Sequence, residues 1–220
     1  QHLPARHRAA RLLPALAALD PQNDYRILRN WRGSTQDKLG PNFRCATTFT
    51  PPHHRLEQWT LSLEIARLRL DLLHSPDFIP PAFGARRFVI TVHDLNFLYS
   101  PQFLTVESRR YYNEQIERAV RKADHILADS EATRGDLTRL LKGPKEKVTT
   151  VHLAADPAFR PLPTPQIKRT LAHYNLIPGY VLFVGTLEPR KNVPGLLSAY
   201  RILLDQEGID APLVIVGGKG

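Results

Sequence analysis

Two adjacent cations follow a buried strand near the end of the chain, in an arrangement suited to binding an anion. Residues Tyr180–Val184 are apolar, β-branched and aromatic, and Gly185 ends the run, so a buried strand is predicted. Arg190 and Lys191 stand in the polar turn that follows, and Asn192 can cap a helix beginning there. Free N–H groups and the positive end of the dipole at a helix N-terminus attract phosphate. The segment therefore predicts a phosphate site, although a surface turn with solvated charges would have the same composition.

Histidine and carboxylate side chains end two strands predicted in the first half of the chain. His93 closes the apolar run Phe88–His93, and Asp94 follows it. His74 ends the shorter strand Leu72–His74. Crevices form at the carboxyl ends of parallel strands, so these side chains can line one crevice. A lone histidine at a strand end is also commonly a satisfied turn residue, and Asp94 suits a turn cap better than a catalytic base.

The sequence predicts no metal site. His53, His54, His74 and His93 lack the spacing of metal ligands, and the chain has no cysteine pair, no His-x-x-x-His motif and no Asp-x-Asp motif. A phosphate bound to this chain would instead be neutralised by arginine, lysine and a helix dipole.

The overall charge favours anionic partners without choosing among them. The chain has 30 Lys and Arg against 21 Asp and Glu, which gives a net charge of +9. Phosphates, nucleic acid and acidic lipid headgroups all fit this balance. The basic residues are scattered, with no long block of like charge and no aromatic strand of the RNA-binding type, which argues against nucleic acid as the partner.

The bulk composition is that of an ordinary folded protein. With 220 residues and a 42% hydrophobic share, the chain is long enough for one large domain or two modest ones. No run approaches the ~18–20 apolar residues of a membrane span. No signal peptide is visible, and the single Cys45 suits a reducing compartment, so the cytoplasm is expected. Gln1 at the start, the lack of methionine and the glycine-rich end after a strand suggest a piece of a longer protein.

Apolar patterns predict helices that alternate with strands. Residues 30–53 are rich in glycine and proline and are expected to form a long loop. Helices are expected at Ala5–Leu19, Leu56–Leu70, Pro101–Ala123, Ser130–Leu141, Ile167–Tyr174 and after Asn192. Strands are expected at Tyr25–Leu28, Leu72–His74, Phe88–His93, Ile126–Ala128, Val148–His152, Tyr180–Val184 and Leu213–Val216. This alternation predicts an α/β fold with a doubly wound parallel sheet, its strands covered on both faces.

Three prolines mark a predicted domain boundary. Pro161, Pro163 and Pro165 occupy every second position, which favours a stiff, extended connector. A second α/β unit begins after them. The sequence therefore predicts one domain over residues 1–160 and the beginning of another over residues 161–220.

Five segments, taken in order, resemble the GT-B glycosyltransferases of family 4, which include retaining mannosyl- and glucosyltransferases. They read HSPDFIPP, VITVHDLNFL, ADHILADSEATRGDL, VHLAADPAFRPL and GTLEPRKN. The resemblance covers nearly the whole chain and implies that residues 1–160 form a Rossmann-like acceptor domain, while 161–220 begin a Rossmann-like nucleotide-sugar domain. It also implies that the family's first strand precedes Gln1 and that its glutamate pair for ribose and sugar lies beyond Gly220. The 220 residues alone are therefore expected to be inactive.

The resemblance also implies roles for particular residues. His93 would face the acceptor and the transferred sugar as the catalytic residue, with His74 and Asp94 on the acceptor side. The nucleotide-sugar would lie against Gly185, Thr186, Arg190, Lys191, Gly217 and Gly218. Many members have an arginine directly after the glycine, but Thr186 stands here, so Arg190 either substitutes for that arginine or points away. Neither a cofactor nor a metal would be required.

The implied activity is transfer of a hexose from a nucleotide-sugar to a hydroxyl of a carbohydrate or lipid-linked acceptor, with retention of configuration. The alternatives are a GT-B nucleotide-sugar epimerase, a glycogen-synthase-like polymerase and, from another class, a basic nucleic-acid-binding α/β module. The helix Pro101–Ala123 places arginines and glutamates at i,i+4 spacing. This pattern predicts a salt-bridged solvent face or, alternatively, peripheral contact with anionic lipid at the inner membrane face.

Overall fold

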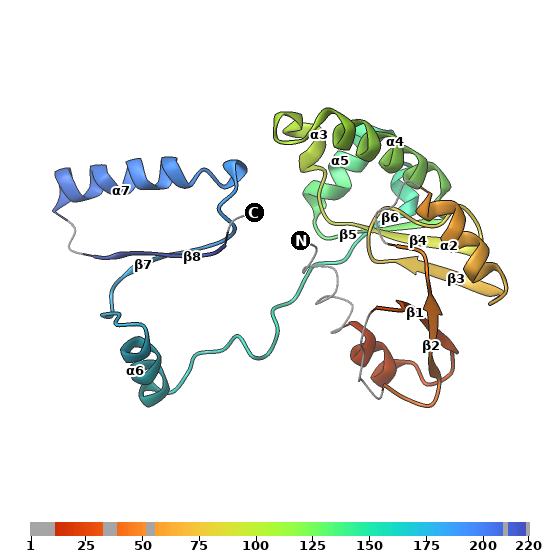
Figure 1. Ribbon diagram of the computed structural model, residues 1–220, viewed down its shortest axis with the longest axis horizontal. Coiled ribbons are helices and arrows are strands. Elements are labelled where there is room, and N and C mark those ends of the chain that lie inside the picture. The colour runs from red at the N-terminus through yellow and green to blue at the C-terminus, as the bar shows by residue number, and fades with distance from the viewer. Residues whose placement is uncertain (1–11, 33–38, 52–55, 209–210, 219–220) are drawn as a thin grey trace. The chain divides into compact units, whose positions relative to one another are not determined.

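The computed structural model describes residues 12–32, 39–51, 56–208 and 211–218 (Figure 1). The chain divides into two compact units, His2–Leu153 and Ala154–Gly220, each of which is described by itself. The predicted boundary between residues 160 and 161 falls within residues 151–163, a segment without helix or strand. Residues 12–19 are helical, and the rest of the helix predicted at Ala5–Leu19 lies outside the described residues.

The first unit alternates strands with helices, and its strands pair in parallel. Its strands are β1 (Tyr25–Asn30), β2 (Phe43–Thr48), β3 (Leu70–Ser75), β4 (Ala85–Val92), β5 (His125–Ala128) and β6 (Val148–Thr150). Its labelled helices are α2 (Glu57–Ala66), α3 (Asn96–Tyr99), α4 (Val106–Lys122) and α5 (Glu131–Leu141), with 3-10 turns at Pro101–Phe103 and Lys145–Lys147. Strands β1 and β2 form one parallel pair, and β3-β4-β5-β6 form a four-stranded parallel sheet in that order.

The second unit is smaller and has the same alternation. It contains α6 (Thr164–His173), β7 (Val181–Val184), a 3-10 turn at Pro189–Lys191, α7 (Val193–Glu207) and β8 (Leu213–Val216). Strands β7 and β8 pair in parallel over their whole length. The protein therefore has an alternating α/β fold on parallel sheets, as the sequence predicted.

The long loop predicted over residues 30–53 is wrong in its second half, because β2 lies within it. Each residue of β1 pairs in register with one of β2, from Tyr25 with Phe43 to Asn30 with Thr48. The rings of Tyr25 and Phe43 stack at 4.4 Å between centroids, which adds a cross-strand contact at the start of the pair. The sequence of β2 is short and largely polar, so its strand character depends on this partner and not on its own pattern.

The helix predicted to begin at Pro101 begins five residues later, at Val106. Thr105 lies in extended backbone, and its hydroxyl accepts a hydrogen bond from the N–H of Ser108 at 3.2 Å. A threonine in this position satisfies one of the unpaired N–H groups of a helix start. The cap therefore sets the beginning of α4, and Pro101 opens a separate 3-10 turn.

The larger core cluster of the first unit lies on one face of the four-stranded sheet, under α4 and α5 (Figure 1), and a smaller cluster joins Ile65 of α2 to Leu73 and Phe88. The fully buried members of the larger cluster are Ile90, Val92, Ile116, Ala123, Ile126, Ala128 and Leu137. Burying an isoleucine, valine or leucine side chain stabilises the fold by about 1.5–3 kcal/mol each. The opposite face of β4, which carries Val89 and Thr91, is only half-buried. Among the described residues this second face is therefore less completely covered than the face under α4 and α5, and the expected cover on both faces stays a prediction.

Hydrogen bonds connect the start of α5 to His93, the residue that follows β4, and so fix the main chain of His93. Ser130 caps α5, as predicted, by accepting a hydrogen bond from the N–H of Thr133 at 3.1 Å. The hydroxyl of Thr133 in turn donates to the carbonyl oxygen of His93 at 3.1 Å. Because Thr133 is buried, this link is shielded from water and holds the two segments together.

Candidate functional site

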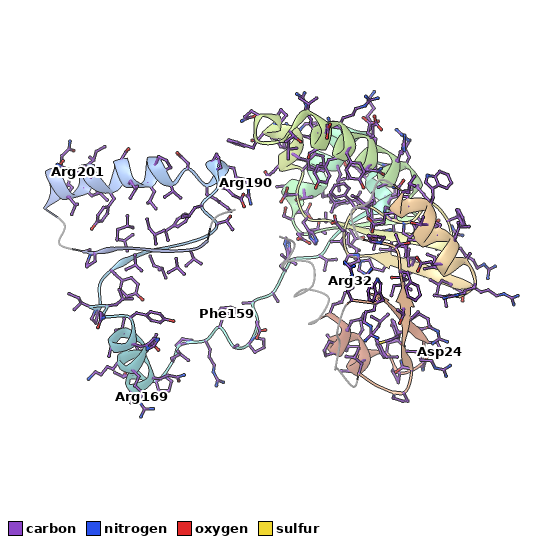
Figure 2. All side chains as sticks on the ribbon, in the orientation of Figure 1. Asp24, Arg32, Phe159, Arg169, Arg190 and Arg201 are labelled. Carbon is purple, nitrogen blue, oxygen red and sulfur yellow. The ribbon has the colours of Figure 1, made fainter. Side chains whose placement is uncertain are left out.

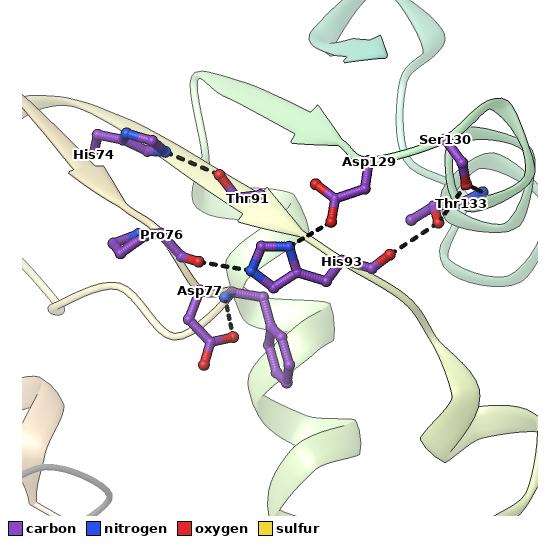
Figure 3. A network of polar contacts seen from close by, with 9 residues as sticks. His74, Pro76, Asp77, Thr91, His93, Asp129, Ser130 and Thr133 are labelled. Atoms are coloured by element: carbon purple, nitrogen blue, oxygen red, sulfur yellow. Dashed lines mark hydrogen bonds and ion pairs between the residues drawn. The ribbon is translucent and has the colours of Figure 1, made fainter. Parts of the chain in front are cut away.

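Three residues that directly follow β3, β4 and β5 meet at one edge of the sheet (Figure 3). Pro76 follows β3, His93 follows β4 and Asp129 follows β5. The three strands are neighbours and parallel, so their carboxyl ends lie at the same edge. This is the edge where α/β proteins form ligand crevices.

The imidazole ring of His93 is held from two sides. Its Nδ1 lies 2.8 Å from Oδ2 of Asp129, and its Nε2 lies 3.0 Å from the carbonyl oxygen of Pro76. The side chains of His93 and Asp129 are only 26% and 14% exposed, respectively. Hydrogen bonds in such partly dehydrated surroundings are stronger than those in bulk water. The fold therefore fixes the orientation of the His93 ring, and it does so through a carboxylate that the sequence did not indicate.

His74 lies away from this network, although Figure 3 shows both in one view. It belongs to β3, and its Nε2 lies 2.9 Å from the hydroxyl oxygen of Thr91 on β4. Burial lowers the pKa of His74, because the charged ring would lose its hydration. The ring thus makes a cross-strand hydrogen bond on the half-buried face of the sheet, and its role at the acceptor stays a prediction.

Asp94, which follows His93, and Asp77, which lies just beyond Pro76, each cap a turn. Oδ1 of Asp94 accepts a hydrogen bond from the N–H of Asn96 at 3.0 Å, at the start of α3. Oδ1 of Asp77 accepts from the N–H of Phe78 at 2.7 Å. The turn-capping alternative is thereby confirmed for Asp94, and its place on the acceptor side stays a prediction.

In the second unit, Glu188 organises the loop between β7 and α7. The hydroxyl of Thr186 donates to one of its carboxylate oxygens at 2.8 Å, and Nε of Arg190 donates to the other at 2.6 Å. These two bonds, that from Thr186 foremost, lower the pKa of Glu188. Arg190, which Figure 2 labels, lies in the 3-10 turn before α7 and is thus paired with Glu188. Lys191 ends the same 3-10 turn, next to the first residues of α7.

The predicted glycines bring bare backbone together at the ends of β7 and β8. The N–H of Gly185 donates to the carbonyl oxygen of Val216 at 3.0 Å, and the N–H of Leu187 donates to that of Gly218 at 2.9 Å. A Cβ atom on Gly217 would lie 1.8 Å from the carbonyl oxygen of Gly185, so only glycine fits there. The loop ends of the two strands therefore form one continuous main-chain surface.

Asn192 caps α7, as predicted, and the cap bears on the predicted phosphate site. Its backbone is left-handed, with a φ of 48°, and its side-chain oxygen accepts from the N–H of Gly195 at 3.3 Å. One of the helix N–H groups that a phosphate could use is thus already bonded to Asn192. Lys191 remains the cation nearest to the helix start in sequence.

The family profile described as glycosyltransferase family 4 matches residues 8–159. The chain belongs to glycosyltransferase family 4. The matched segment includes Pro76, His93 and Asp129, so the three strand-end residues lie within the region that defines membership. A curated relative, the O-antigen chain mannosyltransferase B of Escherichia coli, is 30% identical over 169 residues. That match covers 76% of this family 4 chain and 43% of the relative, so the chain spans less than half of the relative's length.

Two solved structures resemble the family 4 chain at low sequence identity. The Anabaena protein HepE, solved in complex with UDP and glucose, matches with a TM-score of 0.51 and 14% identity, over 81% of this chain and 56% of its own. A glycosyltransferase from Rickettsia africae matches with a TM-score of 0.47 and 12% identity, over 90% of this chain and 69% of its own. At these identities the first likeness supports the GT-B fold, and the second carries no argument.

Two further properties of the described residues bear on this site. In that part of the family 4 chain, no group of three or more histidine, cysteine, aspartate or glutamate side chains is arranged to hold a metal ion. The helices that the structure describes include none with the length and apolar content to cross a membrane.

Sequence reasoning missed Asp129 and Glu188. Asp129 stands directly after a predicted strand, as His93 does, and this shared position was the available signal. Glu188 lies two residues before Arg190, and an acid so close to a predicted phosphate-binding arginine could have indicated their pairing.

Proposed function

We propose that this family 4 protein transfers a hexose from a nucleotide-sugar to a hydroxyl group of a carbohydrate or lipid-linked acceptor, with retention of configuration. The observation that carries the proposal is the His93–Asp129 pair, oriented at the carboxyl edge of the sheet within the family-matched segment. A ring fixed there can contact the acceptor or the transferred sugar. The name of the curated relative supports mannose as the first sugar to test.

The chemistry we propose is positioning together with charge stabilisation. A departing nucleoside diphosphate gains negative charge, which cations and helix N–H groups placed in advance can stabilise. In this chain Lys191 and the first turn of α7 are suited to that task, and the main-chain surface at Gly185 and Gly217 lets a nucleotide approach closely. We assign the contact to the diphosphate to Lys191, and we propose no cofactor or metal.

The contact of this protein with lipid and the compartment in which it works are also proposals. The solvent face of α4 carries ion pairs within the helix, Arg110 and Arg118 with Glu114 and Arg121 with Glu117. These pairs favour the salt-bridged alternative for this face, so a lipid-linked acceptor is not proposed to bind there. We place the reaction in the cytoplasm, where the free, exposed Cys45 would stay reduced.

The first experiment asks whether transfer occurs. The complete enzyme, meaning the protein in which these 220 residues occur, is incubated with a mannose nucleotide or UDP-glucose and with carbohydrate and lipid-linked acceptors. We expect a glycoside whose anomeric configuration, read by NMR, matches that of the donor. An inverted product would contradict retention, and an isomerised nucleotide-sugar would favour the epimerase. A salt-dependent shift of nucleic acid, with no affinity for nucleoside diphosphates, would favour the binding module.

His93→Ala tests the residue on which the proposal depends. We expect kcat to fall about tenfold or more, equivalent to about 1.4 kcal/mol of barrier, with an unchanged unfolding midpoint. His125→Ala is the matched control, because that histidine contacts the Thr149 hydroxyl at 2.8 Å at the opposite end of β5. If His93→Ala instead lowers stability and leaves turnover normal, the histidine serves the fold and not the reaction.

A further inference from the structure

The segment after β4 carries α3, a single helical turn at the carboxyl edge of the sheet. Within it the N–H of Leu98 donates to the carbonyl oxygen of Leu95 at 2.9 Å, and the N–H of Ser100 donates to that of Asn96 at 2.8 Å. One isolated turn of helix is unstable in water, because few hydrogen bonds offset the ordering of its backbone. Contacts with the rest of the first unit must therefore hold α3 in place.

Apolar contacts hold the beginning of this segment. Leu95 is buried in the larger core cluster. The ring of Phe97 stacks on that of Phe78 with 5.5 Å between the centroids, and it lies 5.9 Å from the ring of Tyr112 on α4. Tyr99, the last residue of α3, is 50% exposed. The end of α3 therefore needs an anchor other than the core.

A polar cluster ties the end of α3 to α5, which lies beside it (Figure 1). The hydroxyl of Tyr99 donates to Oδ1 of Asp136 at 2.5 Å. Arg139 donates to the same carboxylate oxygen at 2.9 Å and also to the Tyr99 oxygen. The hydroxyl thus donates and accepts at once. Its bond to Asp136, the foremost cause, raises the pKa of Tyr99, so the hydroxyl keeps its hydrogen at neutral pH.

The helix α5 thereby holds both ends of the segment from His93 to Tyr99. The hydroxyl of Thr133 donates to the carbonyl oxygen of His93 at 3.1 Å, as described above. Thr133, Asp136 and Arg139 follow one another at intervals of three residues, which places them along one side of the helix. One side of α5 therefore fixes the segment from its first residue to the end of α3.

We propose that Tyr99 is a positioning residue, whose hydrogen bonds to α5 fix α3 in the position in which it meets the carbohydrate acceptor. This inference deepens the proposed function and depends on it for the identity of the ligand. Segments that follow parallel strands at their carboxyl ends line ligand sites in α/β proteins. The exposed side chain of Asn96 lies on this segment, and its amide can donate to one sugar hydroxyl and accept from another.

The exposure of the cluster separates positioning from a role in the fold. The Arg139 side chain is 67% exposed, and exposed polar contacts of this kind contribute little to the stability of a whole domain. Loss of the Tyr99 hydroxyl should therefore loosen α3 locally and leave the global unfolding midpoint unchanged. A segment that is ordered in advance costs less to order when a ligand binds, so the loosening should weaken binding of the carbohydrate acceptor.

Hydrogen exchange in the 220-residue chain tests the first step without any enzymatic activity. The amides of Leu98 and Ser100 report on α3, because their hydrogen bonds close its turn. In Tyr99→Phe, which keeps the ring, we expect both amides to exchange about fivefold faster or more, while the amides of α4 keep their rates. NMR methods for fast exchange measure both sets.

Tyr112→Phe is the matched control. The ring of Tyr112 also contacts Phe97, but no hydrogen bond joins its hydroxyl to another described residue. Its loss should leave the exchange of Leu98 and Ser100 unchanged. Unchanged exchange in Tyr99→Phe, or equal acceleration in the two variants, would overturn the proposal.

Kinetics of the complete enzyme test the second step, with methyl mannoside as the probe. It is followed as an acceptor or, where it is not elongated, as a competitor of the acceptor that is. Tyr99→Phe and Asn96→Ala should each weaken its apparent affinity about threefold to tenfold, while KM for the nucleotide-sugar stays within about twofold. Tyr112→Phe should change neither constant. Methyl mannoside that neither accepts sugar nor competes would overturn the assignment of a carbohydrate to α3.

The remaining outcomes distinguish this inference from the proposed function. If Tyr99→Phe raises the constants for methyl mannoside and nucleotide-sugar equally, α3 does not serve the carbohydrate acceptor. If Tyr99→Phe fails to fold, Arg139→Gln, which removes the cation from the cluster, decides through the same amides and constants. A wild-type enzyme that transfers no sugar would overturn the proposed function, while hydrogen exchange would still decide whether Tyr99 fixes α3.

Discussion

Two strand–helix–strand segments of this protein share a pattern and differ in what they bury. In β4–α4–β5 and in β7–α7–β8, four residues of one strand pair in register with four of the other. The first segment contributes fully buried residues from both strands and from the helix to one core. No described residue of Ala154–Gly220 is buried, and Val184 is 70% exposed. Local pattern therefore suffices to form such a segment, whereas its core depends on neighbouring strands and helices.

The two candidate sites differ in the same way. The ring of His93 is held by residues 17 and 36 positions away in sequence, at the ends of two other strands. In the loop that precedes α7, the side-chain contacts join Glu188 to residues two positions away, Thr186 and Arg190, while main-chain hydrogen bonds join the loop to the end of β8. Residues from other strands orient the side chain of the first site, whereas short-range hydrogen bonds orient the side chains of the second. We therefore expect the second site to be the more mobile, and to be ordered further when a ligand binds.

Hydrogen exchange tests the comparison with the largest expected effect. The strand amides of β4 and β5 should exchange at least about a hundredfold more slowly than those of β7 and β8, because opening the first segment exposes a core and opening the second does not. Exchange measured by NMR on the 220-residue chain gives both sets in one experiment, and the helices α4 and α7 provide a second pair. Equal protection of the two segments would show that burial does not separate them.

Lys191→Ala tests the second site alone. A charge-assisted hydrogen bond to phosphate contributes about 1.5–3 kcal/mol, so we expect nucleoside diphosphates to bind about tenfold to a hundredfold more weakly to the complete enzyme. Calorimetric titration should find the affinity for the nucleoside almost unchanged. Arg190→Ala should cost less, because Arg190 is already paired with Glu188. Equal losses for nucleoside and diphosphate would mean that Lys191 shapes the pocket and does not hold the anion.

The helix caps provide the smallest and sharpest test. Ser130 caps α5 in the first unit, and Asn192 caps α7 in the second. Ser130→Ala should lower the free energy of unfolding by about 1 kcal/mol. Asn192→Ala should leave that main transition within about 0.3 kcal/mol, since the second unit adds no buried core to it. Urea unfolding followed by circular dichroism measures both. If the two variants shift the transition equally, the units unfold together.

Much of the fold could be predicted because the sequence carries local signals for it. The apolar run Leu213–Val216 matches β8 in both bounds, and the cap at Ser130 marks the start of α5 as expected. Strand β2 was missed because its polar residues become a strand only beside β1. The start of α4 was misplaced because Pro101 and Thr105 are both suited to a helix start, and the threonine hydroxyl determined which one was used.

The candidate site could be predicted in part, for a related reason. A histidine at the end of a strand could be identified from the chain alone, as His93 was. Its partner Asp129 could not, because the contact depends on which strand lies beside β4, and the sequence does not state the strand order. The pairing of Arg190 with Glu188 is local, and the sequence left open both that this arginine substitutes for the missing one and that it points away.

The contact between Gly217 and Gly185 limits how this gene can change. Any side chain at residue 217 would place its Cβ atom 1.8 Å from the carbonyl oxygen of Gly185. That oxygen belongs to the main chain, which cannot rotate away as the end of a flexible side chain could. At residue 218 nothing lies within 4 Å of the same added atom. As far as folding alone is concerned, substitutions would therefore be rejected at residue 217 and tolerated at residue 218. In a library selected for folding, substitutions should therefore be absent at residue 217 and present at residue 218.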